Sequence, residues 1–229
     1  MNEPVQTFGY GYAGSAQQRN RVLRNTYWLL ALSMIPTVLG AWVGIATGIT
    51  TMLTNGLGLL VFFGGAFAFM FAIEKTKNSS AGVGVLLGFT FFMGLMLSRL
   101  IAVILGFSNG TSLIMTAFGG TAGVFFVMAT LSTIIKRDLS GMAKFLFVGA
   151  LALMIGSVIS VFFPTTTGML VISVMAIGIF SAYMLYDLKR IVDGGETNYI
   201  TATLALYLDA FNVFQSLLML LGIFGGDRD

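Results

Sequence analysis

Two aspartates, Asp187 and Asp209, are the residues best placed to do chemistry, because each lies in or beside a long apolar stretch near the end of the chain. Asp209 lies about ten residues into the apolar run 200–224, and a short carboxylate cannot extend from there to water. A charged group at membrane depth is costly, so it faces the interior of a helix bundle and is by default a functional candidate. On a helix, Asn212 and Ser216 share its face at i+3 and i+7. This polar stripe predicts a cavity lining or a hydrogen bond to a neighbouring helix.

Asp187 follows the preceding apolar run, 169–186, and antiparallel helices joined by a short loop pack side by side. The two carboxylates could therefore meet. In a low dielectric they cannot both ionise easily, so we expect such a pair to share a proton and to sense pH. Two other readings stay open: Asp187 as an interfacial acid beside Lys189 and Arg190, and Asp209 as an interhelical hydrogen-bond partner.

Arg99 is a third charge at membrane depth, about 18 residues into the run 81–105. A long arginine side chain reaches the interface from such a position, so we expect it to snorkel to water.

The residue types that most enzymes of hydrolysis require are missing. The chain has no His and no Cys, which removes thiol nucleophiles, Cys/His zinc sites and the imidazole base of most catalytic triads. Tyr186 and Asp187 form the YD dipeptide of intramembrane aspartyl proteases, but the partner motif GxGD is absent around Asp209, where the chain reads YLDA. We therefore expect no enzyme activity and no catalytic residue.

The elements that position these residues are apolar helices. Of the 229 residues, 57% are hydrophobic and 9% are charged, and the mean hydropathy is +0.93, whereas soluble domains carry about 25% charged residues. We expect an all-α polytopic membrane protein, whose main partner is the lipid bilayer. Seven runs are long enough to cross ~30 Å of hydrocarbon: 27–49, 55–73, 81–105, 111–135, 145–163, 169–186 and 200–224.

The domain boundaries follow from these runs. Residues 26–225 are predicted to form the transmembrane domain, and 226–229 a short C-terminal tail. Residues 1–25 are polar and rich in Gly, Gln and Asn, which predicts a disordered tail.

The basic residues indicate how the protein lies in its membrane. They alternate between the predicted loops, and cytoplasmic loops are the ones that accumulate Lys and Arg. We therefore expect a cytoplasmic N-terminus and a C-terminus outside. Although the formal charge is +3, the basic residues flank spans instead of forming one patch, so we expect no nucleic acid partner. Apart from Arg99 within a span and Arg228 on the opposite side, they are Arg19, Arg21, Arg24, Lys75, Lys77, Lys136, Arg137, Lys144, Lys189 and Arg190.

The stretch SAYMLYDLKRIVDGGETNYITATLALYLDAFNVFQSLL resembles bacterial members of the Bax inhibitor-1 (transmembrane Bax-inhibitor-motif) family. The resemblance rests on YDLKRI with Asp187, on the GGETNYI loop from Gly194 to Ile200, and on LYLDxxNxF with Asp209 and Asn212. It implies a bundle of seven transmembrane helices with the last helix central, in the inner membrane of a bacterium.

The resemblance also implies a function, a pH-sensitive calcium leak through an aspartate pair that Asp187 and Asp209 match. Calcium would then be a transient occupant, and we expect no other cofactor. The basic partner that the family can supply from its second span has its nearest candidates in Lys75 and Lys77. Arg99 stands where the family often has a proline.

Two functions remain in competition at this point. The first is a calcium leak gated by Asp187 and Asp209. The alternative is a regulator without channel activity that binds a membrane-anchored protease or another membrane protein, in quality control or stress response. The GGETNYI loop favours this alternative, because it resembles proteobacterial members linked to membrane-protein quality control.

Overall fold

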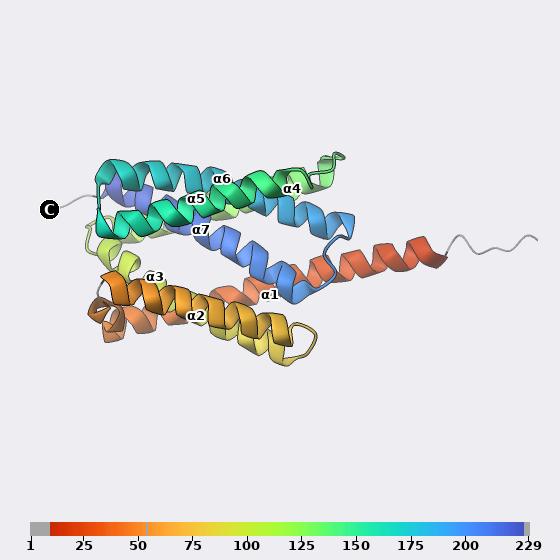
Figure 1. The fold of residues 1–229 in the computed structure, drawn as a ribbon, viewed down its shortest axis with the longest axis horizontal. Helices are drawn as coiled ribbons and strands as arrows, with labels where there is room; N and C mark the ends of the chain where they lie inside the picture. The colour runs from red at the N-terminus through yellow and green to blue at the C-terminus, as the bar shows by residue number, and fades with distance from the viewer. Residues whose placement is uncertain (1–9, 54, 227–229) are drawn as a thin grey trace, which may run out of the picture.

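The protein is a bundle of long helices (Figure 1). The computed structural model describes residues 10–53 and 55–226. Within these residues, seven helices are long and apolar enough to cross a membrane, which confirms the predicted all-α polytopic membrane fold. The elements are α1 (Tyr10–Thr47), η1 (Ile49–Met52), α2 (Asn55–Thr76), α3 (Ala81–Leu105), α4 (Gly110–Ile134), α5 (Met142–Phe162), α6 (Thr166–Asp193) and α7 (Tyr199–Gly225).

The first helix begins much earlier than the sequence suggested. Helix α1 starts at Tyr10, so the prediction of a disordered tail through residue 25 is wrong for residues 10–25. The stretch from Ala16 to Arg24 contains Ala, Gln and Arg, which favour helix, and neither Gly nor Pro. Val22 is also buried against the bundle, which stabilises the extension. Residues 1–9 and 227–229 of the two predicted tails lie outside the described residues.

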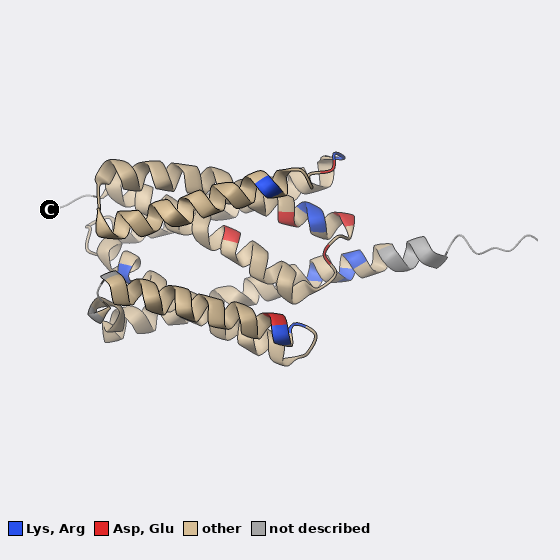
Figure 2. Cartoon of the chain, in the orientation of Figure 1, with Lys and Arg blue, Asp and Glu red and all other residues tan. Residues whose placement is uncertain are grey.

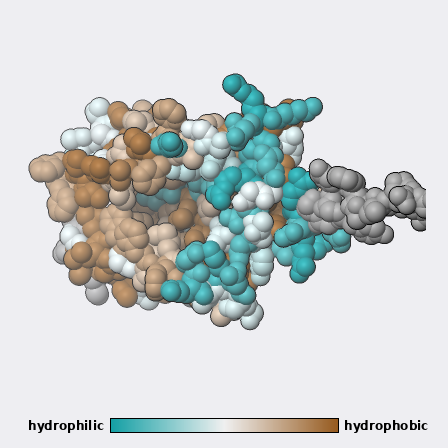
Figure 3. Space-filling view, turned by 45° about the vertical axis from the view of Figure 1, so that its right-hand side comes forward, coloured by the Kyte–Doolittle hydropathy of each residue, from teal (hydrophilic) through white to brown (hydrophobic). Residues whose placement is uncertain are grey.

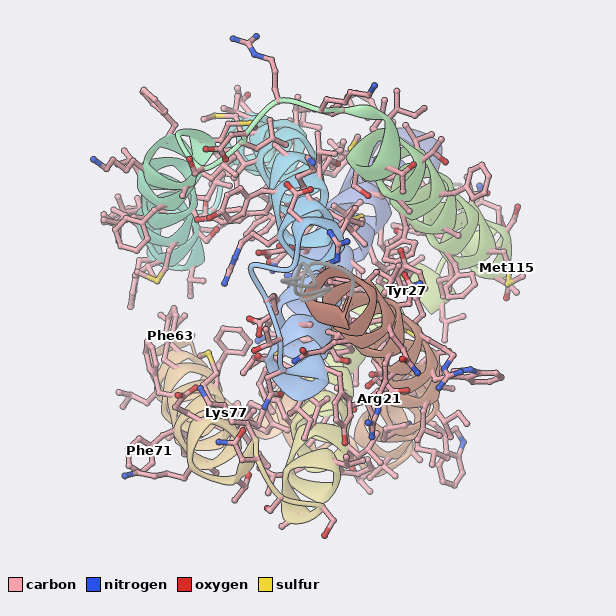
Figure 4. The ribbon with its side chains drawn as sticks, turned by 90° about the vertical axis from the view of Figure 1, so that its right-hand side faces the viewer. Arg21, Tyr27, Phe63, Phe71, Lys77 and Met115 are labelled. Atoms are coloured by element: carbon pink, nitrogen blue, oxygen red, sulfur yellow. The ribbon has the colours of Figure 1, made fainter. Side chains whose placement is uncertain are left out.

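Helix α7 lies in the middle of the bundle, as predicted. It contacts α1, α2, α3, α4 and α6, whereas α5 packs against α6. Looking along the bundle, α7 is surrounded by the other helices, with α2 and α5 side by side along one flank (Figure 4). A helix in this position can carry a charged residue at membrane depth without exposing it to lipid.

Tyr207 fixes α7 to two of its neighbours. Its side chain is almost fully buried, and its hydroxyl oxygen lies 2.9 Å from the hydroxyl oxygen of Thr37 on α1. The same hydroxyl donates to the carbonyl oxygen of Thr90 on α3, at 3.4 Å. The ring packs edge-on against Phe89, with centroids 6.1 Å apart. A buried phenol needs such partners, because in lipid a polar group has no water to bind.

Helices α1 and α3 approach closely through glycines. A Cβ atom at Gly40 would collide with the backbone of Phe91, and one at Gly94 would collide with the backbone of Thr37. Small residues allow this kind of close packing in membranes. Gly48 has a different role, because its φ of 63° ends α1 and begins η1.

The surface separates into a polar end and an apolar body. Most of the charged residues gather where the loops α2–α3, α4–α5 and α6–α7 meet the first turns of α1, which we call the charged end (Figure 2). The hydrophilic surface gathers at the same end, and the remaining surface of this face is largely hydrophobic (Figure 3). Large apolar side chains such as Phe126, Phe145 and Phe67 are exposed on the protein. This surface suits lipid and would be unstable in water.

The glycine contact between α1 and α3 gives a first prediction. We expect Gly94→Ala to destabilise the protein by about 2 kcal/mol, because the backbone atoms that a methyl group would meet cannot move aside. Gly84→Ala in the same helix is the control, since nothing lies within 4 Å of the added atom and alanine favours helix. Thermal unfolding in detergent checks both, and equal midpoints would contradict the close packing.

Candidate functional site

The loop between α6 and α7 holds these two helices side by side. Gly194 adopts a left-handed conformation with φ of 83° and donates its N–H to the carbonyl of Ile191 at 3.1 Å, which ends α6. Asn198 begins α7 as its N-cap, since its side-chain oxygen accepts from the N–H groups of Ile200 and Thr201 at 2.9 and 3.3 Å. The GGETN sequence therefore makes a tight antiparallel connection.

Asp187 on α6 and Asp209 on α7 lie close enough across this pair of helices for their carboxyl groups to interact directly. We call them the aspartate pair. Asp187 lies six residues before the end of α6 and Asp209 ten residues after the start of α7, or roughly 9 and 15 Å along the two helices. The structure thus brings together the two carboxylates that the sequence singled out.

The aspartate pair is shielded from solvent. Asp209 is only 4% exposed, and the side chain of Asp187 is 13% exposed. Among the described residues, the Oδ2 atom of Asp209 has no hydrogen-bond partner. Two carboxyl groups bond to each other only when one of them carries a proton, since an ionised carboxylate has no hydrogen to donate. A hydrogen bond within the aspartate pair would therefore require a proton on one of the two groups.

Arg190 is the basic residue beside the pair. One of its guanidinium nitrogens lies 3.6 Å from Oδ1 of Asp187, and the other lies 3.6 Å from Oε2 of Glu196 in the α6–α7 loop. The guanidinium also lies over the ring of Tyr186, 5.9 Å from its centroid. Because the Arg190 side chain is 44% exposed and is shared between two acids, it neutralises Asp187 only in part.

A chain of polar contacts continues from Glu196 to the other side of the bundle. Glu196 accepts from the N–H of Asn198 at 2.9 Å. The amide group of Asn198 donates to the carbonyl of Lys77 and to the side-chain oxygen of Asn78, at 2.9 and 3.0 Å. The loops α6–α7 and α2–α3 are therefore joined at the charged end, and Arg190 connects them to the aspartate pair.

The other residues of the predicted site lie elsewhere. The Asn212 amide donates to the carbonyl of Leu208 in its own helix at 2.7 Å, and Ser216 is half-buried further along α7. Lys75 lies over the ring of Phe71. Lys77 forms an ion pair with Glu74, so neither lysine contacts the aspartate pair.

Lys75 and Lys77, the candidates for a basic partner from the second span, thus make other contacts in this structure, and Arg190 of α6 is the cation beside Asp187. Its spacing of three residues after Asp187 is a helical contact that the sequence could have indicated. Glu196 could not be found in this way, since its approach to Arg190 depends on how the loop folds back after Gly194.

The acidic side chains of the described residues offer few oxygen ligands at any one place. No cluster of three or more acidic side chains occurs within 10–53 and 55–226, whereas Ca²⁺ takes six to eight oxygen ligands. The aspartate pair supplies carboxylate oxygens from two residues only. A calcium ion there would keep most of its water, as a passing ion does.

Asp138 illustrates an acid that is unsuited to sensing pH near neutrality. It lies in the α4–α5 loop, where its carboxylate accepts from the backbone N–H and the hydroxyl of Ser140, at 2.8 and 2.7 Å. These hydrogen bonds hold the pKa of Asp138 below its usual value. The group is therefore ionised throughout the physiological range.

A family model described as inhibitor of apoptosis-promoting Bax1 matches residues 19–226, which include the whole α6–α7 hairpin. The chain belongs to the Bax inhibitor-1 family. It is 35% identical over 208 residues to the Escherichia coli modulator of FtsH protease YccA, covering 91% of this chain and 92% of that protein. A Pseudomonas aeruginosa protein is 37% identical over 214 residues, covering 93% and 94%. An uncharacterized membrane protein of Vibrio cholerae is 34% identical over 206 residues, covering 90% and 91%.

Proposed function

We propose that this Bax inhibitor-1 family protein is a pH-sensitive cation leak of the bacterial inner membrane, with calcium as its cargo and the aspartate pair as its gate. The observation that carries the proposal is the direct contact of Asp187 with Asp209 at membrane depth. Burying two acids on adjacent helices costs free energy, so such a pair indicates a function that depends on its charge.

The proton on the pair sets the direction of the pH response. At low pH the shared proton forms a hydrogen bond that holds α6 against α7. Raising the pH removes this proton, and two carboxylates about 4 Å apart then repel each other by roughly 4 kcal/mol at an effective dielectric of about 20. Arg190 offsets part of this repulsion, because it already bridges Asp187 and Glu196. The remainder favours separation of the helices or entry of a cation, so the flux rises with pH.

A second candidate function is the regulation of a membrane-bound protease. It is favoured by the name of the E. coli relative, a modulator of FtsH protease that matches nine tenths of this chain. In that case the aspartate pair would serve to hold α6 and α7 together, and the partner would recognise another part of the protein. One simple measurement separates the two functions, namely whether the purified protein alone conducts ions.

Orientation is the second prediction. At the charged end, Lys and Arg lie in the described loops or in the helix turns beside them, whereas 48–53, 106–109 and 163–165 at the opposite end hold none. By the positive-inside rule the charged end is cytoplasmic. A reporter inserted in the loop between Lys136 and Lys144 should therefore score as cytoplasmic, and one fused after Asp229 as periplasmic. A cytoplasmic C-terminus would contradict this orientation.

Calcium flux into proteoliposomes tests the gate. For the parent, flux should rise with pH. Asp209→Asn should remove this dependence and still fold, since its amide can donate to the Asp187 carboxylate and fill the same space. Asp187→Asn should act in the same way, and the double change should add little to either, because the two groups titrate as one unit. The matched control is Asp193→Asn, which alters an exposed acid of the same helix that pairs with Lys189.

Each result has a definite meaning. Absence of calcium flux at every pH, with a folded protein, would reject the leak and leave the protease regulator. Strictly additive effects of the two aspartate changes would reject the coupled gate. A loss of pH dependence in Asp193→Asn as large as in Asp209→Asn would assign the response to the surface charge at the charged end.

A further inference from the structure

A groove follows α2 from the apolar end of the bundle toward its middle. Its outer part is a cavity of about 180 Å³ between η1, α2, α3 and the end of α5, bounded by residues that include Thr50, Gly58, Arg99 and Val161. Its inner part is a cavity of about 370 Å³. The inner part is lined by Phe63, Phe67, Met154, Ile155, Val158 and Ile159, and we call the two together the α2–α5 groove.

The two parts of the groove are adjacent along both helices. Phe62 bounds the outer part and Phe63 the inner part on α2, and Val161 and Ile159 do the same on α5. Phe63 lies on the side of α2 that faces α5 (Figure 4). Several lining side chains stay exposed, including Phe67 at 61% and Ile159 at 54%. The protein itself therefore leaves the groove open to the surrounding lipid.

Arg99 places a positive charge at the outer end of the groove. It lies 18 residues after Ala81, where α3 begins at the charged end, which is about 27 Å along the helix. Arg99 is therefore near the far boundary of a hydrocarbon core that is ~30 Å thick, at the depth where lipid phosphates begin. The guanidinium is exposed, and among the described residues no acidic side chain forms an ion pair with it.

The length of the groove matches one lipid chain in one leaflet. From Gly58 to Phe67 the groove follows nine residues of α2, or about 14 Å. Half of the hydrocarbon core is about 15 Å deep. The lining of the inner part is entirely apolar, so it suits an acyl chain and offers nothing to a polar ligand.

We infer that the α2–α5 groove binds one phospholipid molecule, whose phosphodiester lies on Arg99 and one of whose acyl chains lies between α2 and α5. Arginine suits this headgroup because its planar guanidinium donates two parallel hydrogen bonds to phosphate oxygens. The lipid phosphate neutralises the charge of Arg99 at the membrane boundary. The acyl chain fills the gap between α2 and α5, which make few contacts with each other. The site is distinct from the aspartate pair and does not depend on ion flux.

Native mass spectrometry of the detergent-purified protein tests this site. The probes are phosphatidylglycerol and a diacylglycerol with the same acyl chains but no phosphate. The parent should bind phosphatidylglycerol more tightly than diacylglycerol. Arg99→Gln should weaken phosphatidylglycerol binding about tenfold, since hydrogen bonds to a charged group contribute about 1.5 kcal/mol or more, and leave diacylglycerol binding unchanged. Lys144→Gln, an exposed cation on α5 at the charged end, is the matched control.

A second pair of variants tests the acyl chain. Ile159→Trp should fill the inner groove and weaken binding of both lipids, whereas Val148→Trp, exposed on the same helix outside the groove, should change neither. Equal effects of Arg99→Gln and Lys144→Gln on phosphatidylglycerol would overturn the headgroup site. Unchanged binding in Ile159→Trp would overturn the placement of the chain. Thermal unfolding in detergent verifies that every variant is folded.

Discussion

The bundle brings the carboxyl groups of Asp187 and Asp209 close together, and two such groups can hydrogen-bond only while one of them holds a proton. In water such a contact would be of little consequence, because two ionised acids would separate and be solvated. Here Asp209 is buried and Asp187 is largely shielded from solvent, so each helix that carries an acid must find a partner for it inside the bundle. In the proposed function, the packing of α6 against α7 therefore depends on a single proton.

The remaining helices make that arrangement stable. Close glycine contacts bring α1 against α3, and Tyr207 fastens α7 to both of them by its hydroxyl and its ring. The side of α7 that faces α1 and α3 is held by these contacts, whereas the side that faces α6 carries one acid of the aspartate pair. At the charged end, Asn198 joins the α6–α7 loop to the α2–α3 loop. A change in the charge of the pair can thus be transmitted through Arg190 and Glu196 to a loop that contacts the opposite half of the bundle.

Sequence reasoning found the spans and the aspartate pair because both follow from simple constraints. Apolar runs of about 20 residues fix the helices, and an acid within such a run must face inward. Sequence reasoning failed where tertiary contact decides, since residues 10–25 are helical in part because Val22 packs on the bundle. It also did not indicate that Lys75 and Lys77 would contact side chains of their own helix. The α2–α5 groove could not be predicted from the sequence, since it arises from a gap between helices far apart in the chain.

Infrared difference spectroscopy of the reconstituted protein tests the shared proton most directly, by following the carbonyl stretch of a protonated carboxyl group as pH is raised. If Asp187 and Asp209 hold one proton between them, the parent should show one protonated-carboxyl band that disappears in a single transition. That band should be lost or shifted in both Asp187→Asn and Asp209→Asn, and unaltered in Asp193→Asn. A band that persists unshifted in either of the two aspartate variants would mean that one acid holds its proton independently, and the account of a coupled pair would be wrong.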